Sequence, residues 1–452
     1  MLHFAFILKG RYFIMFSQNE NAIKNIKSEQ CWINPFKLPF EMIKGVTELV
    51  VPDDDIEDAK ERLSRFAPFI KKAFPETEET DGIIESPLRE IPRMQKALEE
   101  EYQTELPGRL FLKMDSHLAV AGSVKARGGI YEVLKHAEDL ALSYGKISLS
   151  DNYEKFASDE MREFLKQYTV EVGSTGNLGM SIGIMSAALG FTVKIHMSQD
   201  AKKWKKDLLR RHGVEVIEYA SDYSLAVSEG RKNSASDPMS YFVDDEKSVD
   251  LFLGYAVAAG RLKKQLDEQN ITVDDTHPLI VCIPAGVGGA PGGICYGLKR
   301  IFGDNVHCFF AEPSNCASVL LGIATQKFEK ANVRDFGASG KTEADGLACA
   351  SPSSFVTRIM TNLVSGIFTV NDGKLYDYMR HLITSENIRI EPSSCAMFEG
   401  VANLTAYENS AEYFKKQGIS KDILKNSTVI AWATGGSLVP DEIFTEYLNT
   451  YL

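Results

Sequence analysis

Ala121-Gly122-Ser123-Val124-Lys125-Ala126-Arg127-Gly128-Gly129 is the stretch from which the rest of this chain can be interpreted. Ser123 is a favourable N-cap residue, so the run predicts a helix with Lys125 in its first turn. The positive end of a helix dipole disfavours a cation, which is expected to lower the pKa of Lys125 toward that of a nucleophilic amine. A lone lysine at a helix start is more often a solvated charge, so its role depends on the other motifs.

A glycine-rich loop lies far downstream, directly after the apolar run 279–283. It reads Pro284-Ala285-Gly286-Val287-Gly288-Gly289-Ala290-Pro291-Gly292-Gly293. Small residues let backbone N–H groups approach a phosphate, and the following helix adds the positive end of its dipole. A dinucleotide site is the alternative, but Pro291 replaces the third glycine of that motif, and no acidic residue is obviously placed for a ribose about 20 residues later.

Two more loops follow predicted strands. Gly173-Ser174-Thr175-Gly176-Asn177-Leu178-Gly179 offers hydroxyls and backbone N–H groups at a helix start, which suits a carboxylate. Thr434-Gly435-Gly436-Ser437 places a threonine at a strand end near the C-terminus. Each is weak evidence alone, because a capped helix start and an ordinary strand end would look the same.

Short apolar runs alternate with helical patterns from about residue 109 onward. The predicted strands are 110–113, 170–172, 191–197, 214–219, 279–283, 306–311 and 428–433, and the predicted helices include 123–143, 177–189, 200–212 and 223–235. This alternation predicts an α/β fold with parallel sheets that helices cover on both faces. Ligands of such folds bind where strands end, so the expected site loops are 173–178, 284–293 and 434–437.

The same pattern suggests how the chain is divided. Residues 166–244 form a compact βαβαβαβ unit, interpreted as a smaller domain inserted into a larger one. The large domain would comprise residues 51–165, which carry Lys125, and residues 245–452, which carry the glycine loop. Residues 17–105 look mainly helical, and residues 1–50 are a weakly assigned N-terminal extension.

Composition narrows the functional class. The 452 residues are 44% hydrophobic and 25% charged with a net charge of −12, so nucleic acid and membrane are not expected partners. Seven cysteines without a Cys-x-x-Cys pair indicate reduced thiols and a cytoplasmic protein. The apolar segment 2–16 contains Lys9 and Arg11 and makes a poor signal peptide, and Met15 is an alternative start.

The four motifs occur in the order seen in fold-type II pyridoxal-phosphate (PLP) enzymes, which include serine and threonine dehydratases and serine racemase. Longer strings resemble the bacterial D-serine dehydratase (D-serine ammonia-lyase) family from about residue 55 to the C-terminus. These strings are Asp115-Ser116-His117-Leu118, residues 122–134, residues 172–179, Phe309-Phe310-Ala311-Glu312-Pro313, Ala344-Asp345-Gly346-Leu347-Ala348 and Trp432-Ala433-Thr434-Gly435-Gly436.

This resemblance implies a role for each motif. Lys125 would carry PLP as a Schiff base, and Asn177 would hydrogen-bond the phenolic oxygen of the cofactor. The phosphate would be lined by Gly286, Val287, Gly288, Gly289 and Ala290. The substrate would be bound by Ser174, Thr175 and Gly176. Lys125 and Thr175 are the candidate acid/base residues, and which of them takes the Cα proton stays open.

Thr434 would face the pyridine nitrogen of PLP. A neutral hydroxyl cannot stabilise a pyridinium as an aspartate does, which disfavours long-lived carbanionic intermediates. Prompt loss of a leaving group from Cβ is then favoured over transamination.

A cation site follows from a departure in one motif. Ser318 stands where some relatives carry a divalent-metal aspartate after Glu312-Pro313-Ser314-Asn315, so the expected ion is monovalent, such as K⁺, held by Glu312 and backbone carbonyls. His117 and His196 are interpreted as structural. Asp244-Asp245-Glu246 is interpreted as a solvated turn, with contact to the substrate hydroxyl as the less favoured alternative.

The resemblance to this family implies that the protein deaminates D-serine to pyruvate and ammonia by PLP-dependent β-elimination, with D-threonine as a further candidate substrate. An L-serine/L-threonine dehydratase or a serine racemase would use the same four motifs. A D-amino-acid sensor without activity is the non-enzymatic alternative, which the intact lysine, loops and threonine oppose. A monomer is compatible with the sequence, which does not determine the oligomeric state.

Overall fold

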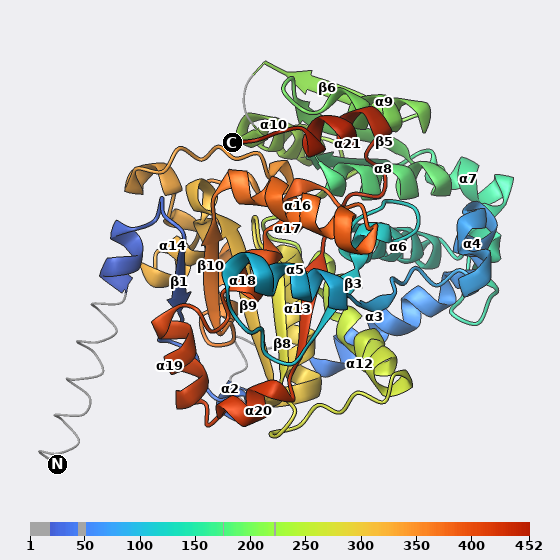
Figure 1. Ribbon diagram of the computed structural model, residues 1–452. Helices are drawn as coiled ribbons and strands as arrows, with labels where there is room; N and C mark the ends of the chain where they lie inside the picture. The colour runs from blue at the N-terminus through green and yellow to red at the C-terminus, as the bar shows by residue number, and fades with distance from the viewer. Residues whose placement is uncertain (1–18, 44–50, 175, 221–222) are drawn as a thin grey trace, which may run out of the picture.

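Two β-sheets, each covered by helices, make up the part of the chain that the computed structural model describes, residues 19–43, 51–174, 176–220 and 223–452 (Figure 1). Both sheets are fully or mainly parallel, as the alternation of strands and helices predicts. The α/β fold class is therefore confirmed.

The larger sheet has seven strands. In sheet order these are β1 (Gln30–Ile33), β10 (Gly366–Val370), β9 (Val306–Pro313), β8 (Leu279–Pro284), β11 (Thr428–Ala433), β3 (Arg109–Met114) and β2 (Leu88–Glu90). The five inner strands are parallel, and β11 pairs with β8 on one side and β3 on the other. The short edge strands β1 and β2 are antiparallel to their neighbours, a feature that the sequence pattern did not predict.

The smaller sheet has four parallel strands, all from one continuous segment. In sheet order these are β6 (Glu215–Tyr219), β5 (Thr192–Ser198), β4 (Thr169–Gly173) and β7 (Ser240–Val243). The segment leaves the larger sheet after β3 and returns to it at β8, so the smaller sheet is an insertion in the chain of the larger one. In Figure 1 it forms the green layer at the top.

Helices surround both sheets. They are α2 (Phe40–Ile43), α3 (Asp53–Arg65), α4 (Ala67–Ala73), α5 (Pro92–Tyr102), α6 (Lys125–Ser143), α7 (Asp159–Leu165), α8 (Asn177–Leu189), α9 (Lys203–Arg211), α10 (Tyr223–Ala235), α11 (Val249–Ala256), α12 (Ala258–Glu268), α13 (Gly289–Phe302), α14 (Ser318–Ala324), α15 (Ser354–Met360), α16 (Asp372–Glu386), α17 (Pro392–Cys395), α18 (Met397–Ala402), α19 (Glu408–Lys416), α20 (Lys421–Lys425) and α21 (Asp441–Leu448). The predicted helices 177–189 and 223–235 have the observed bounds.

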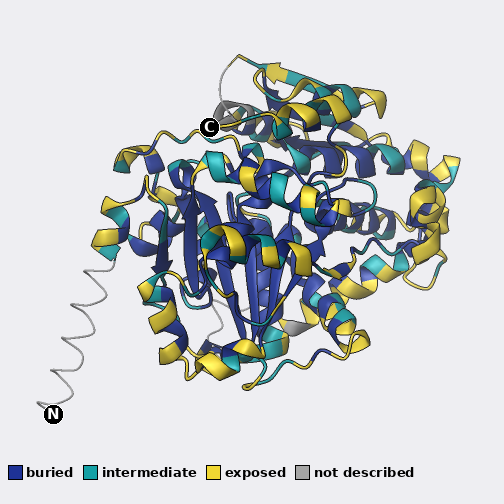
Figure 2. Ribbon diagram, viewed as in Figure 1, coloured by how far each residue is buried: buried dark blue, intermediate teal, exposed yellow. Residues whose placement is uncertain are grey.

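The inner strands of the larger sheet are buried on both faces, and most exposed residues lie on the outer sides of the surrounding helices (Figure 2). Strand β8, for example, is buried along its whole length, which explains its unbroken apolar run. Among the described residues, no helix combines the length and the apolar character needed to cross a membrane.

Candidate active site

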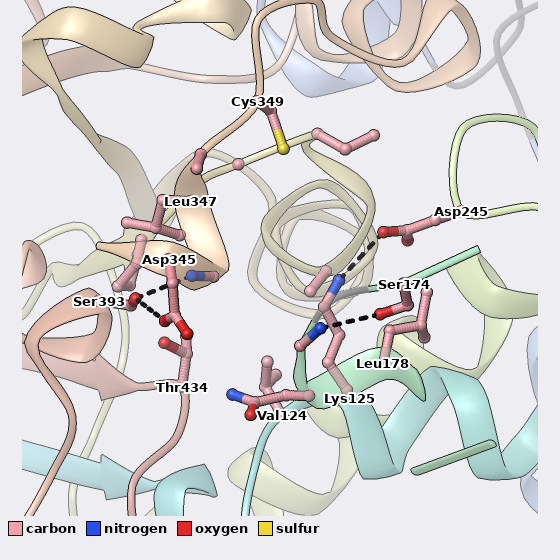
Figure 3. A pocket seen from close by; sticks show the side chains of 18 of the residues that line it. Val124, Lys125, Ser174, Leu178, Asp245, Asp345, Leu347, Cys349, Ser393 and Thr434 are labelled. Atoms are coloured by element: carbon pink, nitrogen blue, oxygen red, sulfur yellow. Dashed lines mark hydrogen bonds and ion pairs between the residues drawn. The ribbon is translucent and has the colours of Figure 1, made fainter. Parts of the chain in front are cut away.

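A cavity of about 320 Å³ lies where strands of both sheets end. From the larger sheet it is lined by the start of α6, the loop after β8 and the residue after β11. From the smaller sheet it is lined by the loops after β4, β5 and β7. Residues of the three predicted site loops, 173–178, 284–293 and 434–437, thus line one cavity, and Figure 3 shows the side chains that meet there.

Lys125 is the first residue of α6 and points into this cavity (Figure 3). Its Nζ lies 3.6 Å from Oδ2 of Asp245, and the Lys125 side chain is 20% exposed. Burial lowers the pKa of Lys125, but the Asp245 carboxylate and Tyr255 outweigh burial, so the net pKa is raised. The expected lowering by the helix dipole is thus wrong, because the neighbouring carboxylate dominates.

Asp245 itself corrects a second expectation. Asp244 and Glu246 pair with Arg231 at the surface, as residues of a solvated turn would. The side chain of Asp245 between them is only 11% exposed and lines the cavity. The acidic turn therefore presents one carboxylate to the site.

The start of α6 is held in a different way from the one predicted. The N-cap residue is Val124, which forms no side-chain cap, so Ser123 is not the N-cap. Instead Ser123 forms an antiparallel bridge with Gly435, and the Val124 N–H donates to the Thr434 carbonyl at 2.8 Å. The backbone next to Lys125 is thus hydrogen-bonded directly to the end of β11.

The glycine-rich loop turns from β8 into α13 against the cavity. The predicted phosphate-binding residues all line it: Gly286, Val287, Gly288, Gly289 and Ala290. Gly288 precedes the helix with φ 108°, a backbone conformation that favours glycine. A Cβ at Gly286 would come within 3.1 Å of the Gly346 carbonyl oxygen, so this position also requires a small residue.

The loop after β4 contributes Ser174, Gly176 and Asn177 to the same cavity. The Ser174 hydroxyl accepts hydrogen bonds from the N–H groups of Gly176 and Gly179 at 3.3 and 3.0 Å, and so caps α8. Thr175 lies outside the described residues, and its catalytic role stays a prediction.

Thr434 faces the cavity from the end of β11. Its Oγ1 lies 3.2 Å from the Ser394 hydroxyl, which also donates to the Gly435 carbonyl at 2.8 Å. The partner of Thr434 is therefore another neutral hydroxyl.

Two acidic residues that line the cavity, Asp345 and Glu391, were not predicted as site residues from the sequence. Asn177 donates to Glu391 at 2.7 Å, and Lys205 pairs with Asp345 at 2.9 Å. Burial raises the pKa of Glu391 to about 7. Asp345 and Glu391 lie in no loop that follows a predicted strand, so the strand pattern did not place them at the site. Residues 344–348 were recognised only as one of the strings that resemble the family.

The other residues considered lie away from the cavity. Both oxygens of Glu312 accept hydrogen bonds, from the N–H groups of Val319 and Leu320 at the start of α14, and burial raises its pKa to about 8. Its role in holding K⁺ stays a prediction. His196 lies inside the smaller sheet between Glu171 and Tyr219, and His117 contacts Ser116, so neither histidine is a cavity residue.

Comparison with known proteins identifies the family. Residues 79–414 match the family described as "Pyridoxal-phosphate dependent enzyme". The chain belongs to this family. It is 59% identical over 436 residues to a protein of Fusobacterium nucleatum named "Probable D-serine dehydratase", covering 96% of this chain and 98% of that one. A protein of Geobacillus kaustophilus with the same name is 52% identical over 419 residues, covering 93% and 94% of the two chains.

Solved structures share the fold at low sequence identity. A crystal structure of Escherichia coli diaminopropionate ammonia lyase in complex with D-serine aligns with a TM-score of 0.69 at 18% identity, covering 93% of this chain and 97% of that one. Threonine deaminase isoform 2 of Solanum lycopersicum aligns with a TM-score of 0.59 at 19% identity, covering 88% and 89%. These likenesses confirm the fold-type II architecture.

The residues at the cavity fit the cofactor of this family. A primary amine stands at one wall, and a loop of small residues with a helix N-terminus stands at another, which are the parts an aldehyde and a phosphate need. Asp245 lines the cavity, and its Oδ1 is a buried oxygen without a hydrogen-bond partner among the described residues. Buried polar atoms are normally satisfied, so this free oxygen agrees with a site built to take a polar ligand.

Proposed function

We propose that this protein is a D-serine ammonia-lyase that uses PLP to convert D-serine to pyruvate and ammonia. The observation that carries the proposal is the cavity itself, which collects Lys125, the glycine loop, Asn177 and Thr434 from four separate parts of the chain. The relatives named "Probable D-serine dehydratase", at 59% and 52% identity over nearly the whole chain, support the choice of substrate.

The cofactor supplies an electron sink for the bond broken at Cα. Lys125 would carry it, and the five residues 286–290 would hold its phosphate through backbone N–H groups. The Ser174-to-Asn177 loop would receive the substrate carboxylate. Removing the Cα proton and the Cβ hydroxyl of D-serine releases one water and leaves an enamine. Hydrolysis of this enamine consumes one water and gives pyruvate and ammonia.

Proton transfers fall to the groups around Lys125. The Lys125 amine can take the Cα proton at Nζ, and the Asp245 carboxylate at 3.6 Å stabilises the ammonium that results. Asp245 lines this wall of the cavity and would accept that proton from Nζ and pass it to the departing hydroxide, which leaves as water. Thr175 remains our candidate for the acid/base group opposite Lys125.

Pyruvate release from separate enantiomers tests the proposal. We expect kcat/KM for D-serine to exceed that for L-serine by at least about 100-fold, a difference of about 2.7 kcal/mol in transition-state stabilisation. D-Threonine is expected to be a slower substrate that yields 2-oxobutanoate. A preference for L-serine would contradict the proposal and indicate an L-serine dehydratase. Conversion of one serine enantiomer into the other without pyruvate would indicate a serine racemase.

Thr434→Asp should slow elimination more than Thr434→Ala. An aspartate would hold a proton on the pyridine nitrogen and stabilise carbanionic states, which lengthens their life and favours racemisation or transamination. We expect pyruvate formation to fall by more than about tenfold, because a hydrogen bond with a charged partner contributes roughly 1.5–3 kcal/mol. Thr434→Ala removes one neutral hydrogen bond of about 0.5–1.5 kcal/mol. Rates of pyruvate and L-serine formation check this, and the reverse order would mean that Thr434 does not face the nitrogen.

We further propose a cytoplasmic monomer that binds K⁺. All seven cysteines are free thiols and six of them are buried, which suits a reducing compartment. Sedimentation of the purified protein tests the oligomeric state, and replacing KCl by a large organic cation tests the requirement for K⁺.

A further inference from the structure

Helix α6 carries a buried carboxyl group, that of Glu132, which faces the acidic turn 244–246. Glu132 lies seven residues after Lys125, about two helical turns along the same helix. Its side chain is buried, with 2% of the residue exposed. No cation pairs with Glu132 among the residues that the structure describes. A buried carboxyl without a cation normally costs stability, so its partners indicate what it does.

The partners of Glu132 are the two residues on either side of the acidic turn. Oε1 accepts a hydrogen bond of 2.8 Å from the Tyr241 hydroxyl, and Oε2 accepts one from the Ser248 hydroxyl. Tyr241 belongs to β7 and lies four residues before Asp245, whereas Ser248 lies three residues after it and caps α11 through the Leu251 N–H at 3.0 Å. One carboxyl group therefore ties both ends of the turn to α6.

Further contacts make this link stiff. The ring of His136, one turn further along α6, stacks on Tyr241 with 4.1 Å between ring centroids. On its other side the turn is held by Ser353, whose hydroxyl donates to the Glu246 carbonyl at 2.6 Å and whose N–H donates to the Val287 carbonyl in the glycine loop. The turn thus has little freedom to move relative to Lys125.

We infer that Glu132 is a positioning residue that fixes the separation of Asp245 and Lys125 by tying the acidic turn to the helix that carries the lysine. This inference rests on the proposed function for the meaning of that separation. Both groups are held by the same helix, so α6 contributes directly to the 3.6 Å contact between them. Without Glu132, Asp245 can withdraw, and the charge that raises the pKa of Lys125 weakens.

The test measures PLP attachment to the apoenzyme as a function of pH. Asp245→Asn removes the carboxylate that keeps Lys125 protonated, so attachment should extend to lower pH. Glu132→Ala should shift the profile in the same direction and lower kcat for D-serine about tenfold, with KM changed less than about twofold. Glu132→Gln should restore the wild-type profile, because an amide can accept from Tyr241 through its oxygen and donate to Ser248 through its nitrogen.

Glu138 provides a matched control on the same helix. It is fully buried but pairs with Arg65 and Tyr153 on the side away from the turn. Glu138→Gln should lower the melting temperature and leave the pH profile unchanged. Tyr241→Phe removes one of the two ties and replaces Glu132→Ala if that variant does not fold.

A wild-type pH profile in Glu132→Ala and Tyr241→Phe, or an equal shift in Glu138→Gln, would overturn the inference. PLP attachment needs no amino-acid substrate, so this outcome is separate from a failure of the D-serine assay. A purified protein that releases no pyruvate from D-serine but shows the predicted shifts would contradict the substrate and not the role of Glu132.

Discussion

Lys125→Ala is expected to abolish turnover of D-serine, with a loss of at least about 10³-fold. The substitution removes both the amine that carries the cofactor and a proton-transfer group, and acid–base catalysis alone contributes about 10²–10⁴-fold. PLP that binds to the variant would have no covalent link to the protein, and Asp245 would lack its cation, so PLP should be released more easily. The measurement is pyruvate formation together with the amount of PLP that survives gel filtration.

Borohydride trapping identifies the lysine directly, because Lys125 and Lys202 both line the cavity and Lys205 lies beside it, paired with the cavity residue Asp345. Only Lys125 should carry the reduced cofactor after digestion and mass spectrometry. Lys205 pairs with Asp345 at 2.9 Å, which keeps its amine protonated and engaged. Lys202→Ala is the control and should retain labelling at Lys125. A label on Lys202 or Lys205 would show that the cofactor is attached at the opposite wall of the cavity and that Lys125 is not the cofactor lysine.

The sequence predicted the parts of the site that are local in the chain. Lys125, the glycine loop and Thr434 each follow a strand or open a helix, and strand ends of a parallel sheet meet at one edge. Short strands at the edge of the larger sheet were harder to predict. Strand β2 has three residues and β1 has four, so neither carries a periodic pattern long enough to recognise.

Electrostatic contacts between distant segments could not be predicted in this way. The pKa of Lys125 is set by Asp245, which is 120 positions later in the chain, and helix geometry alone gave the wrong direction for its shift. Asp345 and Glu391 likewise reach the cavity from parts of the chain far from Lys125. Their roles depend on which side chains the fold brings within a few ångströms, and a single sequence holds no local signal for that.

Ser123 shows the same limit on a smaller scale. Its residue type and place are typical of an N-cap, yet the neighbouring strand β11 offers backbone partners at Thr434 and Gly435. Tertiary hydrogen bonds replace the local cap. The result ties the lysine and the threonine of the site into one rigid unit, which a local cap would not do.

Gly288→Asp is expected to abolish PLP binding while the fold persists. Gly288 has φ 108°, so any side chain adds strain of order 1–3 kcal/mol. Its Cβ would lie 3.2 Å from Cγ1 of Val356, so the new carboxylate either enters an apolar contact or turns toward the cavity. In the cavity it would repel a phosphate, by about 4 kcal/mol for two unit charges 4 Å apart at an effective dielectric constant near 20.

Strain and repulsion together should weaken PLP binding by at least about 100-fold, since each 1.4 kcal/mol is a factor of ten. Gly337→Asp separates the two causes. Gly337 has φ 83° and ψ 7° in an exposed turn where a Cβ would meet nothing within 4 Å. It should lose a few degrees of melting temperature and bind PLP normally. Titration of the apoenzymes with PLP, followed by absorbance, measures the difference. Equal PLP affinity in the two variants would mean that the loop at Gly288 does not face the phosphate.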